Sequence, residues 1–426
     1  MIILIFIIGY LFIVFENFFS LNKTISSILM SVICWSIIIF FNKSVYDLDQ
    51  YLMIKKDPQN LLLLHLGKAS EIIFFLIGTM SIVSIIDKFS AFDALKELLH
   101  IDTKRKLLWK ISFLSFFLSA IIDNLTTSIV LISLLRKIIN KCKERLYYLG
   151  IVIISANAGG VWSPIGDITT TMLWISKKVT TIQLIKRVFI PSILCMLIST
   201  CIASCMSVFD GPIKQNREYK NLSKKNIQIG FHMLKIGIFL MLLVPIYKTI
   251  IGIPPYMGIM FSLGILLCIV LSKKYRNQYS YLNINELFQK LDISSILFFF
   301  GILLSVSSLE VLGILYHTAN WINNVVPTWK ITTFLFGLIS SIIDNVPLVA
   351  ASISMFYYSI DHELWHFIAY VSGTGGSLFL IGSASGVAVM GMEKISFFWY
   401  VKKISWIALI GYISGFIYLL LEQFIF

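Results

Sequence analysis

Three aspartates of this chain stand within or beside long apolar segments, where a charged side chain is costly. Asp123 and Asp344 each end the motif Ser-x-Ile-Ile-Asp, and each is followed by an asparagine. Asp167 follows a run rich in glycine with one proline, residues 157–166. An aspartate at the centre of a transmembrane helix costs about 2.5–3.5 kcal/mol on insertion scales, so such residues are usually functional. The alternative for any one of them is a structural, hydrogen-bonded carboxylate.

Oxygen-bearing side chains surround these aspartates, and they suit a hard cation. By analogy with other hard cations, sodium prefers carboxylate, amide, hydroxyl and carbonyl oxygens. Burial favours the protonated carboxyl, while a bound cation favours the ionised form, so proton and cation compete for one group. This competition is the physical basis of antiport. We predict a cation and proton site with Na⁺ at Asp123, Asn124 and Asp167, and the full set of site residues is Asp123, Asn124, Asn157, Asp167, Thr169, Thr170, Asp344 and Asn345.

A second group of polar residues is expected to support the site or to form a proton path. Its members are Glu71, Ser119, Thr374, Ser383 and Ser385. Glu71 stands about ten residues from either end of its apolar run, which places it about 15 Å deep at 1.5 Å per residue. The alternatives are a structural carboxylate for Glu71 and small helix-packing residues for the hydroxyls.

The elements that must position these residues are membrane-spanning helices. Of the 426 residues, 58% are hydrophobic and only 13% are charged, against about 25% charged in soluble domains. Apolar runs of about 20 residues are typical of transmembrane helices. The first run lacks a basic start and a small-residue cleavage site, so we interpret it as a retained span. About ten spans are predicted, near 1–19, 24–41, 61–86, 145–175, 184–209, 231–251, 255–272, 293–315, 364–390 and 401–424.

Neither the charge nor the cysteines point to another class of protein. The net charge of +13 comes from basic residues in short loops between apolar runs, so nucleic-acid binding is not indicated. The six cysteines form no C-x-x-C pair and are expected to be small packing residues. No metal, haem or iron–sulfur pattern is present in the sequence, and no organic cofactor is expected.

Two further apolar segments are predicted to be re-entrant hairpins, residues 108–137 and 329–360. In each segment, an Asp-Asn pair separates two apolar arms. A transmembrane helix needs about 20 residues, and both arms are shorter than that. A polar tip at membrane depth is tolerated where it is buried in protein or faces a water-filled cavity.

The chain contains an internal repeat. The two hairpin motifs are 221 positions apart, and the glycine-rich segments that start at Gly159 and Gly375 are 216 positions apart. We therefore predict a first half at 1–209, a linker at 210–230 and a second half at 231–426. Each half has three spans, a hairpin, a broken span (145–175 or 364–390) and a closing span. The odd number of spans between equivalent positions makes the repeats inverted, as in alternating-access transporters.

The distribution of basic residues predicts the orientation. One side holds 25 of the 35 lysines and arginines, Lys23 among them, and the positive-inside rule makes that side cytoplasmic. Both termini are then external. The first hairpin enters from the cytoplasm and the second from outside.

Three segments resemble the signature segments of NhaD-type sodium/proton antiporters: 119–127, 156–174 and 372–386. These antiporters belong to a broad ion-transporter superfamily that also contains divalent-anion symporters and arsenite pumps. The resemblance covers the chain from about Glu71 to Met392. It implies exchange of sodium or lithium for protons across the bacterial inner membrane by a homodimer with scaffold and transport domains. It also implies functional roles for the site and supporting residues named above.

The alternatives differ in the chemistry they require. A sodium-coupled symporter for a dicarboxylate or similar anion would need a cationic pocket, and no Arg or Lys lies in the inner part of a predicted span. The Asp-Asn pairs also replace the Ser-Asn-Thr type tips of the symporter relatives. An intramembrane enzyme could pair Asp123 with Asp344, but inverted repeats favour transport over catalysis. A structural scaffold would not need acidic hairpin tips.

Overall fold

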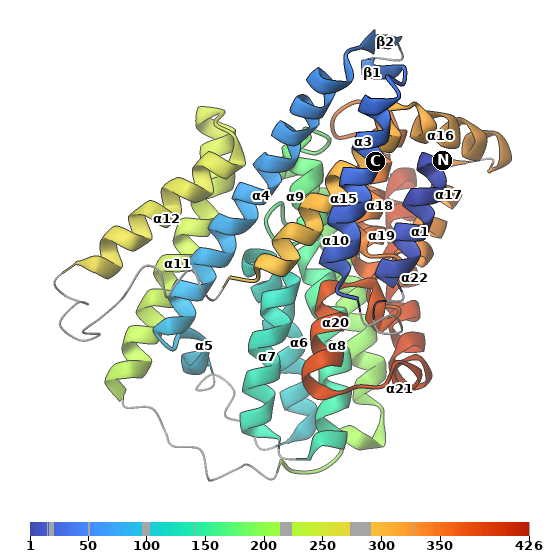
Figure 1. The fold of residues 1–426 in the computed structure, drawn as a ribbon. Coiled ribbons are helices and arrows are strands. Elements are labelled where there is room, and N and C mark those ends of the chain that lie inside the picture. The colour runs from blue at the N-terminus through green and yellow to red at the C-terminus, as the bar shows by residue number, and fades with distance from the viewer. Residues whose placement is uncertain are drawn as a thin grey trace.

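The fold is built almost entirely of helices (Figure 1). The computed structural model describes residues 1–14, 16, 21–49, 52–95, 103–139, 141–213, 224–272, 291–326 and 328–425. The chain is an all-α polytopic membrane protein, as its composition predicts. Among the described residues, six helical stretches are long and apolar enough to cross a bilayer: α3 (Lys23–Phe40), α4 (Pro58–Lys88), α10 (Thr181–Ser204), α11 (Lys224–Ile251), α15 (Ile293–Val311) and residues 397–422, which consist of α21 (Phe397–Tyr400), a π-helical turn (Val401–Ser405) and most of α22 (Trp406–Ile425).

Shorter apolar helices pack beside these long stretches. Helix α1 (Ile2–Val14) packs against α3, and α12 (Pro255–Leu271) packs against α4 and α11. In the predicted first span, 1–19, the described helix ends at Val14. Residues 15 and 17–20 lie outside the described part of the chain. The basic segments 96–102, 214–223 and 273–290, which carry part of the predicted charge asymmetry, also lie outside it.

Two helical hairpins occupy the predicted segments. The first consists of α6 (Lys104–Ile122) and α7 (Asn124–Ile138), with Asp123 alone between them. The second consists of α17 (Trp329–Ser340) and α18 (Asn345–Met355). Figure 1 shows α6 and α7 in the lower part of the molecule and α17 and α18 in the upper part. The two tips thus approach the middle of the molecule from opposite ends.

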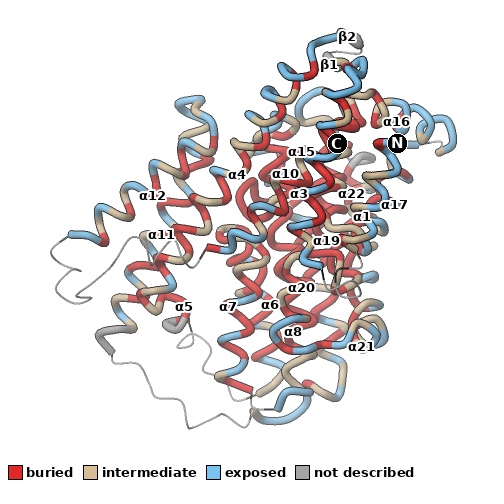
Figure 2. The backbone as a smooth tube through the Cα atoms, viewed as in Figure 1, coloured by how far each residue is buried: buried red, intermediate tan, exposed pale blue. Residues whose placement is uncertain are grey.

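Two broken helices follow the hairpins. Helix α8 (Cys142–Gly160) is separated from α9 (Ile168–Ile175), and α19 (Glu363–Gly375) is separated from α20 (Ala384–Glu393) by a short 3₁₀ turn, Leu380–Gly382. The ends of α8 and α19 nearest the breaks are buried on all sides, and Figure 2 shows them within the most buried part of the fold. Proline and glycine in the first break explain its position, because they disfavour a continuous helix.

Glycines allow each hairpin to pack backbone to backbone on its broken helix. A Cβ atom on Gly159 would overlap the carbonyl oxygen of Phe116 in α6, and one on Gly375 would overlap that of Gly337 in α17. Beside these contacts, Ser119 Oγ donates to Ala156 O at 2.6 Å, and its repeat counterpart Ser340 donates to Ser372 O at 2.6 Å. These paired contacts recur at the two offsets of the sequence repeat.

Three features differ from the sequence prediction. The predicted span 293–315 ends at Val311, because Gly313 adopts a left-handed conformation (φ 71°) and begins a separate helix, α16 (Ile314–Val325). Helix α11 already begins at Lys224, inside the segment 210–230 that was expected to be linker. A small antiparallel hairpin, β1 (Val45–Asp49) paired with β2 (Leu52–Lys56), joins α3 to α4 and was not predicted.

We expect Gly159→Ala to destabilise the protein, because the added methyl group would overlap the α6 backbone, which cannot rotate away. Overpacking of this kind costs about 1–3 kcal/mol. Thermal unfolding of the purified protein in detergent should show a lower Tm. Gly264→Ala in α12 is the matched control, since a Cβ there meets nothing within 4 Å. An equal Tm for Gly159→Ala and the wild type would contradict the close contact.

Candidate functional site

The first helix break holds Asp167 in a defined position. Asp167 is the N-cap of α9, and its Oδ1 atom accepts hydrogen bonds from the backbone N–H (2.9 Å) and the hydroxyl (2.8 Å) of Thr169. Thr170 donates to the carbonyl oxygens of Ser163 (2.8 Å) and Asp167 (2.9 Å). The loop of the break is therefore tied to the start of α9, and the carboxylate is held by one of its two oxygens.

The second oxygen of Asp167 faces both hairpin tips. Asn124 at the first tip donates its amide N–H to Oδ2 at 2.6 Å, and Asn345 at the second tip donates to the same atom at 3.5 Å. All three residues are buried, and Asp167 is only 2% exposed. A single buried carboxylate oxygen is thus shared by residues from both halves of the chain.

Asn157 extends this network toward the second helix break. Its Oδ1 atom accepts from Asn124 (3.0 Å) and from Ser385 (3.0 Å), and its Nδ2 atom donates to Ser383 (3.0 Å). Ser383 is the N-cap of α20 and accepts from Gly386 N at 3.2 Å. We call the following residues the central network: Asn124, Asn157, Asp167, Asn345, Ser383 and Ser385.

Asp123 lies beside the central network without a hydrogen bond to it. Both of its carboxylate oxygens accept from Thr126, one from the backbone N–H (2.7 Å) and one from the hydroxyl (2.9 Å). It is close enough to Asp167 for their charges to interact. Its backbone has φ 77° and ψ 159°, a region that a residue with a side chain occupies at a cost of about 1–3 kcal/mol. Such strain is typical of functional sites.

The second acidic tip has a different partner. Asp344 caps α18 through Val346 N (3.3 Å), and its Oδ2 atom lies 3.8 Å from the ammonium nitrogen of Lys23 at the start of α3. The sequence prediction put Lys23 in a cytoplasmic loop, because it stands between two apolar runs. Its position immediately after Asn22, the N-cap of α3, was the available signal that it begins a helix.

The remaining predicted residues do not join the central network. Thr374 donates to Tyr370 O within its own helix, and Ser119 holds α6 against α8. Thr170 stabilises the break. Glu71 is half-buried on α4 and lies close enough to Lys248 of α11 for their charges to interact. Among the side chains that the structure describes, these four contribute to the frame around the site rather than to its centre.

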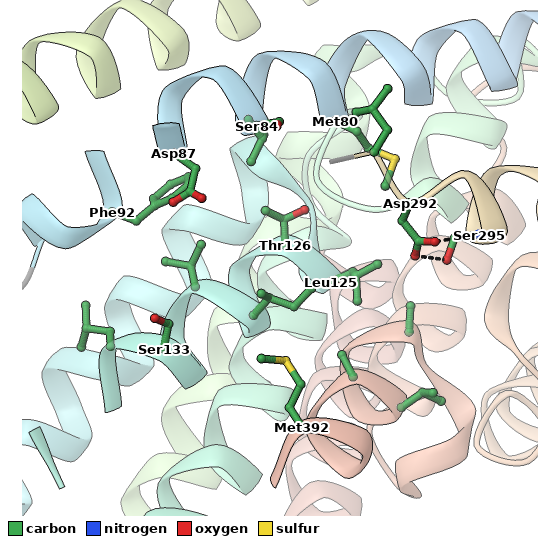
Figure 3. A pocket seen from close by; sticks show the side chains of 18 of the residues that line it. Met80, Ser84, Asp87, Phe92, Leu125, Thr126, Ser133, Asp292, Ser295 and Met392 are labelled. Atoms are coloured by element: carbon green, nitrogen blue, oxygen red, sulfur yellow. Dashed lines mark hydrogen bonds between the residues drawn. The ribbon is translucent and has the colours of Figure 1, made fainter. Parts of the chain in front are cut away.

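A cavity of about 850 Å³ lies beside the tip of the first hairpin, where Leu125 and Thr126 line it (Figure 3). Its walls come from α4, α7, the start of α15 and α20, and labelled examples are Met80, Leu125, Asp292 and Met392. Its lining includes Thr126, which holds Asp123, and Ala384, which stands between Ser383 and Ser385. The cavity therefore borders residues that are next to Asp123 and to the central network.

Different polar contacts link the helices at the two ends of the core. Near the open cavity, Glu393 at the end of α20 binds Arg136 (2.5 Å) and Arg145 (2.7 Å), so it ties the second helix break to α7 and α8. At the opposite end, Asp361 accepts from the backbone N–H and the hydroxyl of Thr180, at 2.7 and 2.8 Å. Arg145 and Asp361 stand at repeat-related positions, 216 residues apart.

Comparison with known proteins assigns the chain to a family. Residues 10–375 match the family model described as citrate transporter (CitMHS). The chain is 39% identical over 97% of its length to "Sodium/proton antiporter 1" of Arabidopsis thaliana, covering 70% of that protein, and 36% identical to "Sodium/proton antiporter 2" of the same plant, covering 97% of each. It is 28% identical to the Na⁺/H⁺ antiporter NhaD of Vibrio cholerae, over 96% of this chain and 89% of that protein.

These relatives are transporters, and their similarity runs through both hairpins and both helix breaks. The family match spans four residues of the central network, Asn124, Asn157, Asp167 and Asn345, whereas Ser383 and Ser385 lie beyond residue 375. The similarity to the second plant antiporter covers 97% of the chain. The chain therefore belongs to the CitMHS family of membrane transporters and is a homologue of the NhaD-type sodium/proton antiporters.

Proposed function

We propose that this protein exchanges Na⁺ or Li⁺ for H⁺ across a membrane by alternating access, with Asp167 as the group for which cation and proton compete. The observation that carries this proposal is the shared Oδ2 atom of Asp167, which receives amide donors from the tips of both hairpins. The names of the plant and bacterial relatives support sodium/proton exchange as the activity.

The chemistry follows from the cost of a buried charge. An ionised carboxylate inside a membrane protein needs a proton, a cation or several donors to compensate it. In the present arrangement Asp167 accepts from Thr169 twice and from Asn124 and Asn345 once each. A cation at Oδ2 would repel the two amide N–H donors. Asn124 and Asn345 would then have to turn their carbonyl oxygens toward the ion.

This reorientation offers a way to couple occupancy to movement. Asn124 and Asn345 are the first residues of α7 and α18, so a change in their side chains acts directly on both hairpin tips. Thr126, the hydrogen-bond partner of Asp123, lines the cavity. We propose that Asp123 receives the cation or proton from the cavity and passes it to Asp167.

Alternating access requires the cavity to close and the opposite end to open. The cavity lies on the side that the sequence predicts to be cytoplasmic, so the structure corresponds to an inward-facing state in this proposal. The bonds between Asp361 and Thr180 and the bond from Ser354 to Glu310 (2.7 Å) lie on the other side. We propose that these contacts break in the outward-facing state.

Several sequence predictions remain part of this proposal. They are the division into halves 1–209 and 231–426, the external position of both termini, the homodimer and the location in a bacterial cell membrane. The relatives come from a plant as well as from bacteria. They therefore support a location in a membrane, but they do not single out a bacterial membrane. The protein needs no cofactor in this proposal, because the transported ions are its substrates.

A second candidate function is sodium-coupled uptake of an anion such as a dicarboxylate or citrate. The description of the matching family, citrate transporter, favours it. The cavity also has Lys23, Arg136 and Lys137 among its lining residues. The central network itself contains an acidic and no basic side chain, which favours cations. Sodium-dependent accumulation of labelled citrate or succinate by proteoliposomes would support the anion function instead.

We expect Asp167→Asn to abolish exchange, because the neutral amide can neither bind a proton at this site nor compensate a cation. The assay uses everted vesicles from an antiporter-deficient bacterium, energised to acid inside, with a fluorescent ΔpH probe. Sodium or lithium should dequench the signal with the wild type and not with Asp167→Asn or Asp123→Asn. Asp210→Asn, an exposed aspartate that pairs with Arg105, is the control and should behave as the wild type. Sodium-driven exchange by Asp167→Asn would overturn the mechanism.

We expect Asn124→Ala to raise the half-saturating sodium concentration more than Asn345→Ala does. The Asn124 amide lies 2.6 Å from Asp167 and that of Asn345 lies 3.5 Å away, so Asn124 would supply the nearer carbonyl oxygen to a cation at Oδ2. Loss of a hydrogen-bonding group beside a charge costs about 1.5–3 kcal/mol, which corresponds to roughly a 10- to 100-fold change. The same vesicle assay with a sodium titration measures it, and Asn320→Ala on the exposed face of α16 is the control. Equal half-saturation in all three variants would argue against a site at Asp167.

A further inference from the structure

The two hairpin tips carry equivalent aspartates that are satisfied in different ways. Asp123 receives two donors from the residue three positions later, Thr126. The equivalent position after Asp344 is Pro347, which has neither a backbone N–H nor a hydroxyl. Asp344 is therefore left with backbone donors alone, Val346 N at 3.3 Å and the N–H of Asn345. Its charge must be compensated by something other than its own helix.

Lys23 supplies that compensation. Its ammonium nitrogen lies 3.8 Å from Asp344 Oδ2, and the two side chains are only 20% and 12% exposed. The same ammonium lies 4.4 Å from the centre of the Phe298 ring on α15, a cation–π contact that is strengthened where water is scarce. Lys23 is thus held between the second hairpin tip and α15.

The backbone of Lys23 is anchored as firmly as its side chain. Its N–H donates to Glu16 at 3.3 Å, and the neighbouring Thr24 hydroxyl donates to Ser294 O at the start of α15 at 2.9 Å. Asn22 caps the helix through Thr24 N. These contacts fix the first turn of α3 against α15, so the backbone from which the Lys23 side chain extends is held beside the hairpin tip.

Among the described residues, the other groups near Asp344 carry no positive charge. The buried hydroxyl of Tyr10 on α1 and the carboxylate of Asp167 are near enough to Asp344 for electrostatic interaction, and Asn345 follows it in the chain. The Tyr10 hydroxyl has no hydrogen-bond partner among the described residues. The local charge at the second tip is balanced by Lys23.

We propose that Lys23 is a positioning residue whose ammonium permanently takes the place of a cation at Asp344, so that transported ions act at Asp123 and Asp167 only. This inference rests on the proposed exchange function and deepens it, because it assigns unequal roles to the two repeat-related aspartates. The positive charge of Lys23 also offsets the negative charge of Asp344 near Asp167. This offset sets how strongly sodium is bound at Asp167.

The test measures the half-saturating sodium concentration for exchange in the vesicle assay. Lys23→Gln leaves Asp344 uncompensated and should lower that concentration roughly fivefold, because one more negative charge attracts the cation. Asp344→Asn leaves the ammonium unpaired and should raise it by a similar factor. The double variant Lys23→Gln/Asp344→Asn restores the balance and should return within about twofold of the wild type. Lys23→Arg should also stay near the wild type, and Lys43→Gln, an exposed lysine just beyond the other end of α3, is the control.

The outcomes separate this inference from the function on which it rests. A silent wild type would reject the proposed exchange itself. An active wild type, with both single variants shifted in the same direction or with a double variant no better than Asp344→Asn, would overturn the charge compensation. If Lys23→Gln does not reach the membrane, the comparison of Asp344→Asn with the double variant decides alone. A purely structural pair would lower the amount of folded protein without opposite shifts in half-saturation.

Discussion

A single buried carboxylate governs the organisation of this molecule. Asp167 lies in the interior of a membrane protein, where an uncompensated charge is too costly to keep. The helix break beside it supplies two donors from Thr169, and the hairpin tips supply the other two from Asn124 and Asn345. The hairpins must therefore end at the depth of the break, and the breaks must expose polar backbone only where protein covers it.

Glycine makes this convergence possible. The tips reach Asp167 because α6 lies against α8 at Gly159 and α17 lies against α19 at Gly375, with no side chain between the backbones. The serine bonds beside these contacts, from Ser119 and Ser340, hold each pair in register. The two halves thus use the same packing device to bring their tips to one place, where they meet at a shared atom.

The halves differ in the charges they bring to that place. The first half provides Asp167 at its break, whereas the second provides Ser383, which binds Asn157. At the first tip, Thr126 donates hydrogen bonds to Asp123. At the second tip, Lys23 from outside the hairpin compensates the charge of Asp344. A symmetric frame therefore holds an asymmetric site. This is consistent with the membership of the chain in a family whose members include sodium/proton antiporters and whose description names citrate.

The sequence by itself determined the class of the protein and most of the site. Uncharged runs identified the membrane helices, and the Asp-Asn motifs and the glycine-proline run marked the hairpin tips and the first break, because breaking a helix in a membrane requires particular residues. The repeat offsets predicted which segments would correspond. Four of the six residues of the central network were named as site residues from the hydrogen-bonding side chains at these points, and the other two, Ser383 and Ser385, were named as supporting residues. Tertiary structure decided which of these residues touch: Asp167 became the centre, Asp123 and Asp344 took different partners, and Glu71 and Thr374 stayed outside. It also brought Lys23 to the second tip and turned α16 away from α15. These outcomes depend on contacts between segments up to several hundred residues apart, and no local pattern or periodicity carries that information.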